Sequence, residues 1–397
     1  MKYTTKKHQI TSYLYQFRTL SYDSIYKYIF EREGLTVRYC EETLKKMVGE
    51  GLIEKKGFYK NESFYLIAKK GMDYLKEYGV IEVGSDEITE SFDLLPLSKI
   101  KINDRLLEHQ AALARFVLRW SETIEFKYYD EKYISRILPG ARPDGLVVTD
   151  NYMYFLEMDM NTEGKRALND KWTHYAEFLN SKEYYEMNKP IKVLFILGGK
   201  ATKRTGRKSL LKKDISGMLY PYINKKFNFV FGTEDELFSI LKEENKNIAR
   251  HKFDEYGYDM KTGNFDPQFF GGEDFDFYGV TKAVAQKKQP NRHSLYEFVF
   301  DDYTNDNEYT FLKVQRAATF LSVFLNKTKR DINYVILVNK EEDAVRLCKE
   351  AEYFSNQIYF ITVNRFNRSL HSALFQVDYE GRIWHFSDDD IKVAFPE

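Results

Sequence analysis

One segment, ARPDGLVVTDNYMYFLEMDMNTEGK (141–165), combines strand-like runs with charged residues where a buried hairpin would normally carry apolar ones. Three carboxylates and one guanidinium lie within eighteen residues of each other. Carboxylates at close spacing are the groups that bind divalent cations or transfer protons, so this segment is the first candidate for chemistry. Its charged residues of interest are Arg142, Asp144, Glu157 and Asp159.

The hairpin register decides whether these groups meet. The runs LVVT and YMYFLEM predict two strands, and Asp150-Asn151 between them suits a two-residue turn. That turn places Asp144 opposite Glu157 and Arg142 opposite Asp159. Because side chains alternate between the two faces of a strand, all four are expected on one face. An error of one residue in the turn would scatter the cluster.

Facing carboxylates repel each other unless positive charge lies between them. Arg142 offsets one charge, and grouped carboxylate oxygens suit Mg²⁺ or Mn²⁺ for the rest. A surface cluster of salt bridges without metal is the alternative. The helix expected after the hairpin, from about residue 163 to 179, carries Lys171 and Tyr175 one turn apart on one face. Lys171 is predicted to reach the carboxylates and to stabilise charge on a phosphate, although a solvated lysine is the simpler interpretation.

The first 80 residues predict a DNA-binding domain. Helices are expected over 4–18 and 21–30, and a third begins after Thr36 as its N-cap. Two strands with a polar tip and a closing helix follow, which is the order of a winged helix-turn-helix. This region holds 15 Lys and Arg against 10 Asp and Glu, and positive charge favours DNA. The inner face of the third helix is predicted to comprise Val37, Cys40, Leu44 and Met47.

In such a fold the third helix enters the major groove and the wing contacts the phosphate backbone. A winged helix used for protein contacts or dimerisation is the alternative. The candidate DNA contacts are Arg38, Tyr39, Thr43, Lys45 and Lys46 on the helix, Lys55, Lys56 and Lys60 on the wing, and Arg142 in the later hairpin.

The remaining chain predicts a mixed α+β or α/β protein. Residues 81–97 are expected to form a linker, 98–247 an α/β domain that contains the hairpin, 248–292 an acidic irregular connector, and 293–397 a C-terminal α/β domain. The order of strands and helices after residue 293 loosely repeats that of residues 152–232, which suggests a degenerate duplication without a second active site. For the basic segment from residue 200 to 213, binding of a nucleic-acid backbone and a solvated loop beside a helix are equally open. In the long helix that opens residues 98–247, one side carries Leu106, Leu113, Phe116, Val117 and Trp120.

The motif Pro143-Asp144, then Glu157-Met158-Asp159, then Lys171, resembles the core of the PD-(D/E)XK nucleases. The usual lysine is replaced by Asp159, and Lys171 would be its migrated equivalent. Together with the winged helix and Asn161-Thr162-Glu163, the motif makes residues 1–235 similar to the replication-relaxation family, which includes MobC-type plasmid relaxases.

This resemblance implies a relaxase that nicks one strand at an origin of transfer or replication. It implies catalytic roles for Asp144, Glu157, Asp159 and Lys171, with the three acids as metal ligands and Glu108 as an extra acidic ligand. The adjacent His109 is interpreted as an ordinary helix histidine. Tyr175, the tyrosine nearest the site, is a guess at a nucleophile beside activated water. Duplex DNA and accessory relaxosome or transfer-channel proteins are the implied partners.

Two other functions stay open, namely a non-catalytic DNA-binding regulator of plasmid replication and a double-strand restriction-type endonuclease. Phosphate-binding glycine loops and the serine hydrolase motif are absent from the sequence. The two cysteines exclude a disulfide framework. The sequence shows neither a signal-peptide pattern nor a run of 18 apolar residues, so we expect a cytoplasmic protein without a membrane span.

Overall fold

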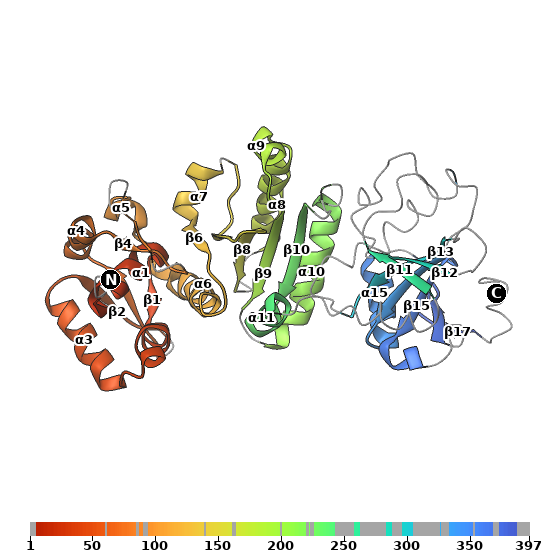
Figure 1. Cartoon of the computed structure of the whole chain (residues 1–397), viewed down its shortest axis with the longest axis horizontal. Coiled ribbons are helices and arrows are strands. Elements are labelled where there is room, and N and C mark those ends of the chain that lie inside the picture. Colours follow the sequence, from red (N-terminus) through yellow and green to blue (C-terminus); the bar gives the residue numbers. More distant parts are fainter. Residues whose placement is uncertain are drawn as a thin grey trace. The chain divides into compact units, whose positions relative to one another are not determined.

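A computed structural model of the 397-residue chain divides into two compact units, residues 1–204 and 205–397. Both units combine helices with sheets, so the prediction of a mixed α/β protein is confirmed (Figure 1). The structure describes residues 5–59, 62–84, 87–89, 94–138, 140–160, 164–198, 201–219, 222, 226–242, 258–262, 283–287, 296–304, 326, 333–351, 354–367 and 373–386.

The first unit begins with helices and a hairpin in the expected order. Ser21 and Thr36 cap their helices, the latter as predicted, since their hydroxyls accept hydrogen bonds from the amides of Ser24 and Tyr39. The hairpin strands pair antiparallel, and a short strand after the first helix adds to the second hairpin strand. The elements are α1 (Lys6–Phe17), β1 (Leu20–Ser21), α2 (Tyr22–Ile25), η1 (Tyr26–Phe30), η2 (Glu31–Glu33), α3 (Val37–Gly49), β2 (Ile53–Tyr59), β3 (Glu62–Ile67) and α4 (Lys69–Tyr78).

Helix α3 has one apolar face, as the spacing predicts. Cys40, Leu44 and Met47 are at most 2% exposed, whereas Val37 is 45% exposed. The placement of Val37 on the inner face was therefore wrong. It is the first residue after the N-cap, where the helix has not yet reached the core.

The segment predicted as a linker contains two short paired strands, β4 (Val80–Ile81) and β5 (Ile88–Thr89). Gln16 of α1 holds the first of them in place. Its side-chain amide donates to the Ile81 carbonyl and accepts a hydrogen bond from the Val83 amide. Two helices follow, α5 (Leu97–Ile100) and, after the turn η4 (Asp104–Leu106), α6 (Leu107–Trp120). Leu106 precedes α6 and is 51% exposed, so it does not belong to the inner face predicted for that helix.

The N-terminal elements and α6 share one core. Phe64 and Leu66 of β3 pack in a single buried cluster with Leu107 and Ala111 of α6. Polar groups also lie between the N-terminal elements and α6, and Arg18 is at their centre. Arg18 follows the last residue of α1, has a left-handed φ of 66° and is 7% exposed.

The Arg18 guanidinium crosses from α1 to the next part of the unit. It donates to Gln110 at 2.8 Å, and its Nε lies 2.9 Å from Asp130 Oδ2. Burial raises the pKa of Asp130 to about 6 although Arg18 opposes this rise. In addition, the Tyr15 hydroxyl accepts the Leu95 amide at 2.8 Å. The two parts of the first unit are thus joined by buried apolar and polar contacts.

A five-stranded sheet follows, with the order β10-β9-β8-β7-β6. The strands β6, β7 and β8 form an antiparallel meander, and β9 runs parallel to β8 after the helical connection. The elements are β6 (Lys127–Asp130), α7 (Glu131–Ile137), β7 (Gly145–Val148), β8 (Met153–Asp159), α8 (Lys165–Leu179), α9 (Lys182–Glu186), β9 (Ile191–Leu197) and β10 (Phe227–Gly232).

Helices cover β8 on both faces, and aromatic contacts identify which helix covers which face. Tyr154 meets Trp120 of α6 with ring centroids 4.9 Å apart. The next residue, Phe155, points the other way and meets Tyr175 and Phe178 of α8. Side chains at odd positions of β8 therefore face α8.

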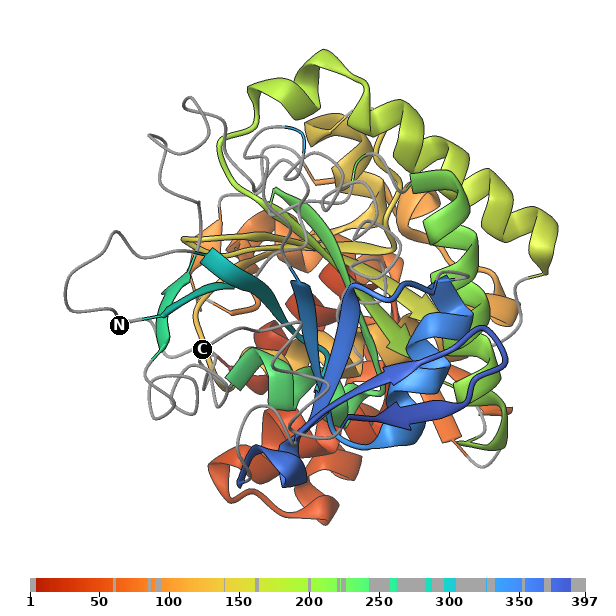
Figure 2. The same cartoon turned by 90° about the vertical axis from the view of Figure 1, so that its right-hand side faces the viewer.

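The second unit contains a seven-stranded sheet with strands in chain order, coloured teal to blue in Figure 2. From residue 201 onward, the basic segment is part of helix α10 (Ala201–Leu219), so of its two interpretations the solvated loop was wrong. The other elements are α11 (Glu234–Lys242), β11 (Tyr258–Thr262), β12 (Ala283–Lys287), β13 (Tyr296–Asp302), β14 (Asn333–Val338), α15 (Glu341–Ala351), β15 (Ile358–Thr362), η8 (Val363–Asn367), β16 (Leu374–Val377) and β17 (Ile383–His385).

The two sheets share a strand pattern. In the second, β11, β12 and β13 form an antiparallel meander and β14 runs parallel to β13, as β6 to β9 do in the first. A helix also lies between the next two strands of each sheet, α10 in one case and α15 in the other. This agreement extends the loose sequence repeat, and duplication stays a prediction. Most of the acidic connector lies outside the described residues, but the part that is described forms β11 and β12 of this sheet rather than an irregular segment.

Candidate active site

The register of the hairpin agrees with the prediction. Gly145 pairs with Leu156, and Val148 with Met153, so the turn lies where Asp150-Asn151 placed it. Asp144 directly precedes β7, and its amide bonds the Leu156 carbonyl. The acidic residues thus gather at the end of the hairpin away from the turn.

Glu157 is the centre of the site. Its side chain is fully buried and faces α8, in agreement with its odd position on β8. The Lys171 ammonium donates to Oε2 at 2.7 Å, and the Tyr175 hydroxyl donates to Oε1 at 2.6 Å. Lys171 and Tyr175, predicted to share a helix face, therefore hold the two oxygens of one carboxylate.

Burial dominates the electrostatics of Glu157. It raises the pKa of this carboxyl to about 7, and the nearby Asp144 charge adds to the rise although Lys171 opposes it. A carboxyl with a pKa near neutrality exchanges protons under physiological conditions, as a general acid or base must. Burial and the Glu157 charge hold the pKa of Tyr175 well above its usual value of 10. Tyr175 is therefore a poor nucleophile in this arrangement and orients Glu157 instead.

Asp144 has a different environment. Its Oδ2 accepts the Met158 amide at 2.8 Å and lies 3.4 Å from His109 Nε2. Burial alone would raise the pKa of Asp144, but the hydrogen bond from His109 and the Lys171 charge outweigh it and lower that pKa. The pKa of His109 is correspondingly raised, because its bond to Asp144 outweighs the effect of burial. One carboxyl of the site is thus held ionised while the other titrates near neutrality.

His109 was missed as a site residue, and the neighbouring Glu108 was chosen instead. Successive residues on a helix point about 100° apart, so α6 cannot aim both side chains at Asp144. The sequence held a usable signal, since His109 lies four residues before Leu113, a buried position on the predicted inner face. The interpretation of His109 as an ordinary helix residue is corrected by its contact with Asp144.

Of the other two hairpin residues, Asp159 agrees with the prediction and Arg142 does not. Asp159 is 1% exposed and lies on the same face of β8 as Glu157, as expected. Arg142 is exposed and lies beyond the last described pair of the ladder, Gly145 with Leu156. The expected pairing of Arg142 with Asp159 is therefore wrong, because the strand ends before the arginine is reached. Lys171 supplies the positive charge instead.

The metal prediction can be tested against this donor set. Carboxylate oxygens suit Mg²⁺ and Mn²⁺, and Asp144 and Glu157 supply them. However, both oxygens of Glu157 already accept protein donors, and the Lys171 ammonium occupies the place of a cation. Among the described residues, no group of three or more His, Cys, Asp or Glu has an arrangement that could hold a metal ion. The residue types fit a divalent cation, whereas the arrangement requires Lys171 to leave Glu157 first.

Most of the candidate DNA contacts that the structure describes lie at exposed positions of α3 and β2. Arg38 is exposed and pairs with Glu42 at 2.8 Å, and Tyr39 is 47% exposed. The Thr43 hydroxyl donates to its own helix, and Lys56 pairs with Asp104 at 3.3 Å. Lys45, Lys46 and Lys55 are exposed, whereas Lys60 and the Asn161-Thr162-Glu163 motif lie outside the described residues.

No family model, no curated protein and no solved structure matches this chain. In the part of the chain that the structure describes, none of the helices is both long and apolar enough to cross a membrane.

Proposed function

We propose that the chain is a metal-dependent DNA endonuclease that nicks one strand of a duplex recognised by its N-terminal domain. The observation that carries the proposal is the cluster at the end of the β7–β8 hairpin. It joins an ionised Asp144, a titrating Glu157 and Lys171 at one edge of the sheet. The order of a helix, an antiparallel meander, a helix and a parallel strand is also the order expected for a PD-(D/E)XK core.

Each residue has a role that follows from its contacts. Lys171 is a donor to a carboxylate in this state and is positioned to stabilise charge on a phosphate once it leaves Glu157. His109 and the Met158 amide hold Asp144 in place and ionised. Tyr175 fixes the rotamer of Glu157, so the attacking group is water. A bound Mg²⁺ or Mn²⁺ would polarise the scissile phosphate and favour hydroxide formation.

The N-terminal part supports the DNA-binding half of the proposal. Its order of three helices and a hairpin is that of a winged helix, and α3 exposes several basic residues together. The narrower proposal, a relaxase at a plasmid transfer origin, rests on the resemblance to the replication-relaxation family. Accessory relaxosome proteins belong to the same proposal.

A non-catalytic DNA-binding regulator is the second candidate. The observation that favours it is the occupation of both Glu157 oxygens by Lys171 and Tyr175, which gives the site a stable arrangement without metal. The two candidates differ in one respect that can be measured, namely whether phosphodiester bonds break.

The test uses supercoiled plasmid carrying the DNA that flanks the gene, with Mg²⁺ or Mn²⁺. Wild-type protein and Asp170→Asn, a matched control with an exposed carboxylate on α8, are expected to yield open circles. Asp144→Asn and Glu157→Gln are expected to lose cleavage while they still retard the same DNA in a gel. Retardation without cleavage by the wild type supports the regulator, and linear products support a restriction-type enzyme.

A further inference from the structure

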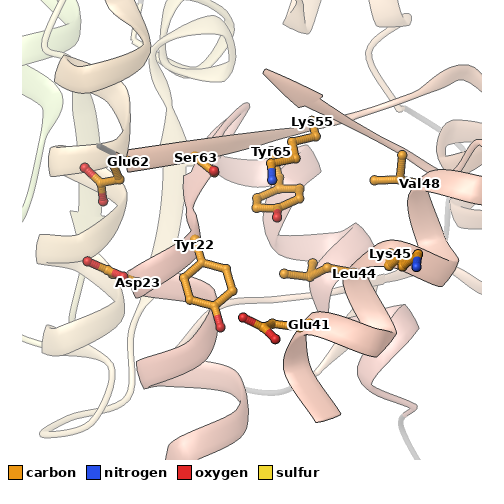
Figure 3. Close-up of a pocket in the computed structure, with 10 residues that line it drawn as sticks. All are labelled: Tyr22, Asp23, Glu41, Leu44, Lys45, Val48, Lys55, Glu62, Ser63 and Tyr65. Carbon is orange, nitrogen blue, oxygen red and sulfur yellow. The ribbon is translucent and has the colours of Figure 1, made fainter. Parts of the chain in front are cut away.

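A cavity of about 510 Å³ lies within the N-terminal domain, between α2, α3 and the β2–β3 hairpin (Figure 3). Its volume is in the range of small-molecule sites. The proposed nuclease site does not use any of its residues. The lining comprises Tyr22, Asp23, Glu41, Leu44, Lys45, Val48, Lys55, Glu62, Ser63 and Tyr65.

The charged groups of the lining favour a bound cation over a bound anion. It has three carboxylates against two ammonium groups, and Figure 3 shows the Lys45 side chain directed away from Tyr22. Two tyrosine rings, Tyr22 and Tyr65, form part of the wall, and aromatic faces attract organic cations. Val48, which is 38% exposed, adds an apolar surface that would contact methylene groups.

One polar group in the wall lacks a partner. The Tyr22 hydroxyl oxygen is buried and makes no hydrogen bond within the described structure. Figure 3 shows this hydroxyl directed towards Glu41. Burial raises the pKa of Tyr22 to about 12, and the negative charges of Glu41 and Asp23 contribute, so the hydroxyl stays neutral in a negative environment. A buried hydroxyl oxygen without a partner costs free energy, and a ligand N–H that donates to this oxygen would offset part of that cost.

A bare metal ion does not fit this site. The described residues hold no arrangement of three or more metal-ligating His, Cys, Asp or Glu side chains, and a cavity of about 510 Å³ is far larger than an ion needs. An extended amine fills the volume better, because its ammonium groups pair with the carboxylates while its methylenes cover Val48 and the Tyr22 ring.

We propose that this cavity binds a small aliphatic polyamine. One ammonium group lies between Glu41 and the Tyr22 hydroxyl, which accepts its N–H, and another pairs with Asp23 or Glu62. The binding site is independent of the nuclease proposal. Its consequence for DNA rests on the proposed function: Lys45 and Lys55 line the same cavity, so a bound polycation adds positive charge beside the surface proposed to contact phosphates.

The test is isothermal titration calorimetry of the full chain with spermidine, without DNA, in about 0.15 M NaCl, where weak surface attraction is screened. Wild-type protein is expected to bind in a saturable manner. Glu41→Gln is expected to weaken binding about tenfold, because it removes the carboxylate that faces the Tyr22 hydroxyl. Tyr22→Phe keeps the ring and is expected to weaken binding about threefold.

The control is Glu42→Gln, the same charge change on the next residue of α3, outside the cavity lining and paired with Arg38. It is expected to leave the affinity within about twofold. If Glu41→Gln and Glu42→Gln weakened binding equally, the binding would be general attraction to a negative surface, and the proposal would be overturned. Lack of saturable binding by the wild type would overturn it as well. Either failure leaves the nicking assay unaffected, because no polyamine is used there.

Discussion

Glu157→Gln should remove a specific part of the pH dependence of stability. The fully buried Glu157 has a pKa of about 7 in the folded protein, against a usual value of 4.5. The folded state therefore binds a proton that the unfolded state has already lost between these two pH values. By linkage, stability falls as pH rises through this window and is constant above it.

The magnitude follows from the same two values. The difference between 4.5 and about 7, at about 1.4 kcal/mol per pKa unit, amounts to about 3 kcal/mol. Glutamine is neutral at every pH and keeps an oxygen that can accept one of the two hydrogen bonds. The stability of Glu157→Gln relative to wild type is therefore expected to increase by about 3 kcal/mol between pH 5 and pH 8.

Urea unfolding at pH 5, 6, 7 and 8 measures this difference. Tryptophan fluorescence is the suitable probe, because Trp120 and Trp172 are buried in the first unit. Glu177→Gln, an exposed position on α8, is the matched control and should keep a constant difference from wild type across this range. A flat difference for Glu157→Gln would refute the reasoning. So would a relative loss of stability at high pH, because it would mean that Lys171 holds Glu157 ionised throughout.

Three further predictions concern other parts of the first unit. His109→Gln should lower the free energy of unfolding in urea by about 1 kcal/mol more at pH 6 than at pH 9, because a histidine with a raised pKa stabilises the fold only while its ring is protonated. An equal loss at both pH values would contradict the ion pair with Asp144. Gly71→Ala should destabilise the N-terminal domain by roughly 3 kcal/mol in thermal unfolding, since the added Cβ would lie 2.3 Å from the Leu52 carbonyl oxygen; an unchanged midpoint would show that the backbone adjusts. Lys45→Ala should lower the slope of log affinity against log salt by about 1 for duplex DNA, whereas an unchanged slope would exclude a phosphate contact.

The hairpin was predictable because a short turn leaves little freedom. Asp150-Asn151 determines the register, and the register brings Asp144 to the end of the ladder beside Glu157. The contact of Lys171 with Glu157 followed from helical spacing and from the need for positive charge. These inferences use local geometry, which the sequence specifies well.

The errors came from features that local patterns do not specify. Glu108 and His109 are neighbours, and only the exact rotation of α6 against the sheet decides which one meets Asp144. Arg142 was misplaced because a pairing rule does not say where a strand ends. The helix α10 contradicts the solvated loop, which was one of two interpretations of its charges. Basic residues are compatible with a helix when apolar ones such as Leu211 and Ile215 are buried.

The shared core of the first unit fixes the distance between helix α3 and the carboxylate cluster. Arg18, Gln110 and Asp130 join the N-terminal domain to the sheet through buried contacts, rather than through a free tether. If α3 lies in a major groove, the distance along the DNA to the carboxylate cluster is then a property of the protein. Under the proposed function, cleavage would then occur at a constant number of base pairs from the recognised sequence. Inserting about five base pairs between the two would turn the scissile strand to the opposite side of the duplex, out of reach of Glu157.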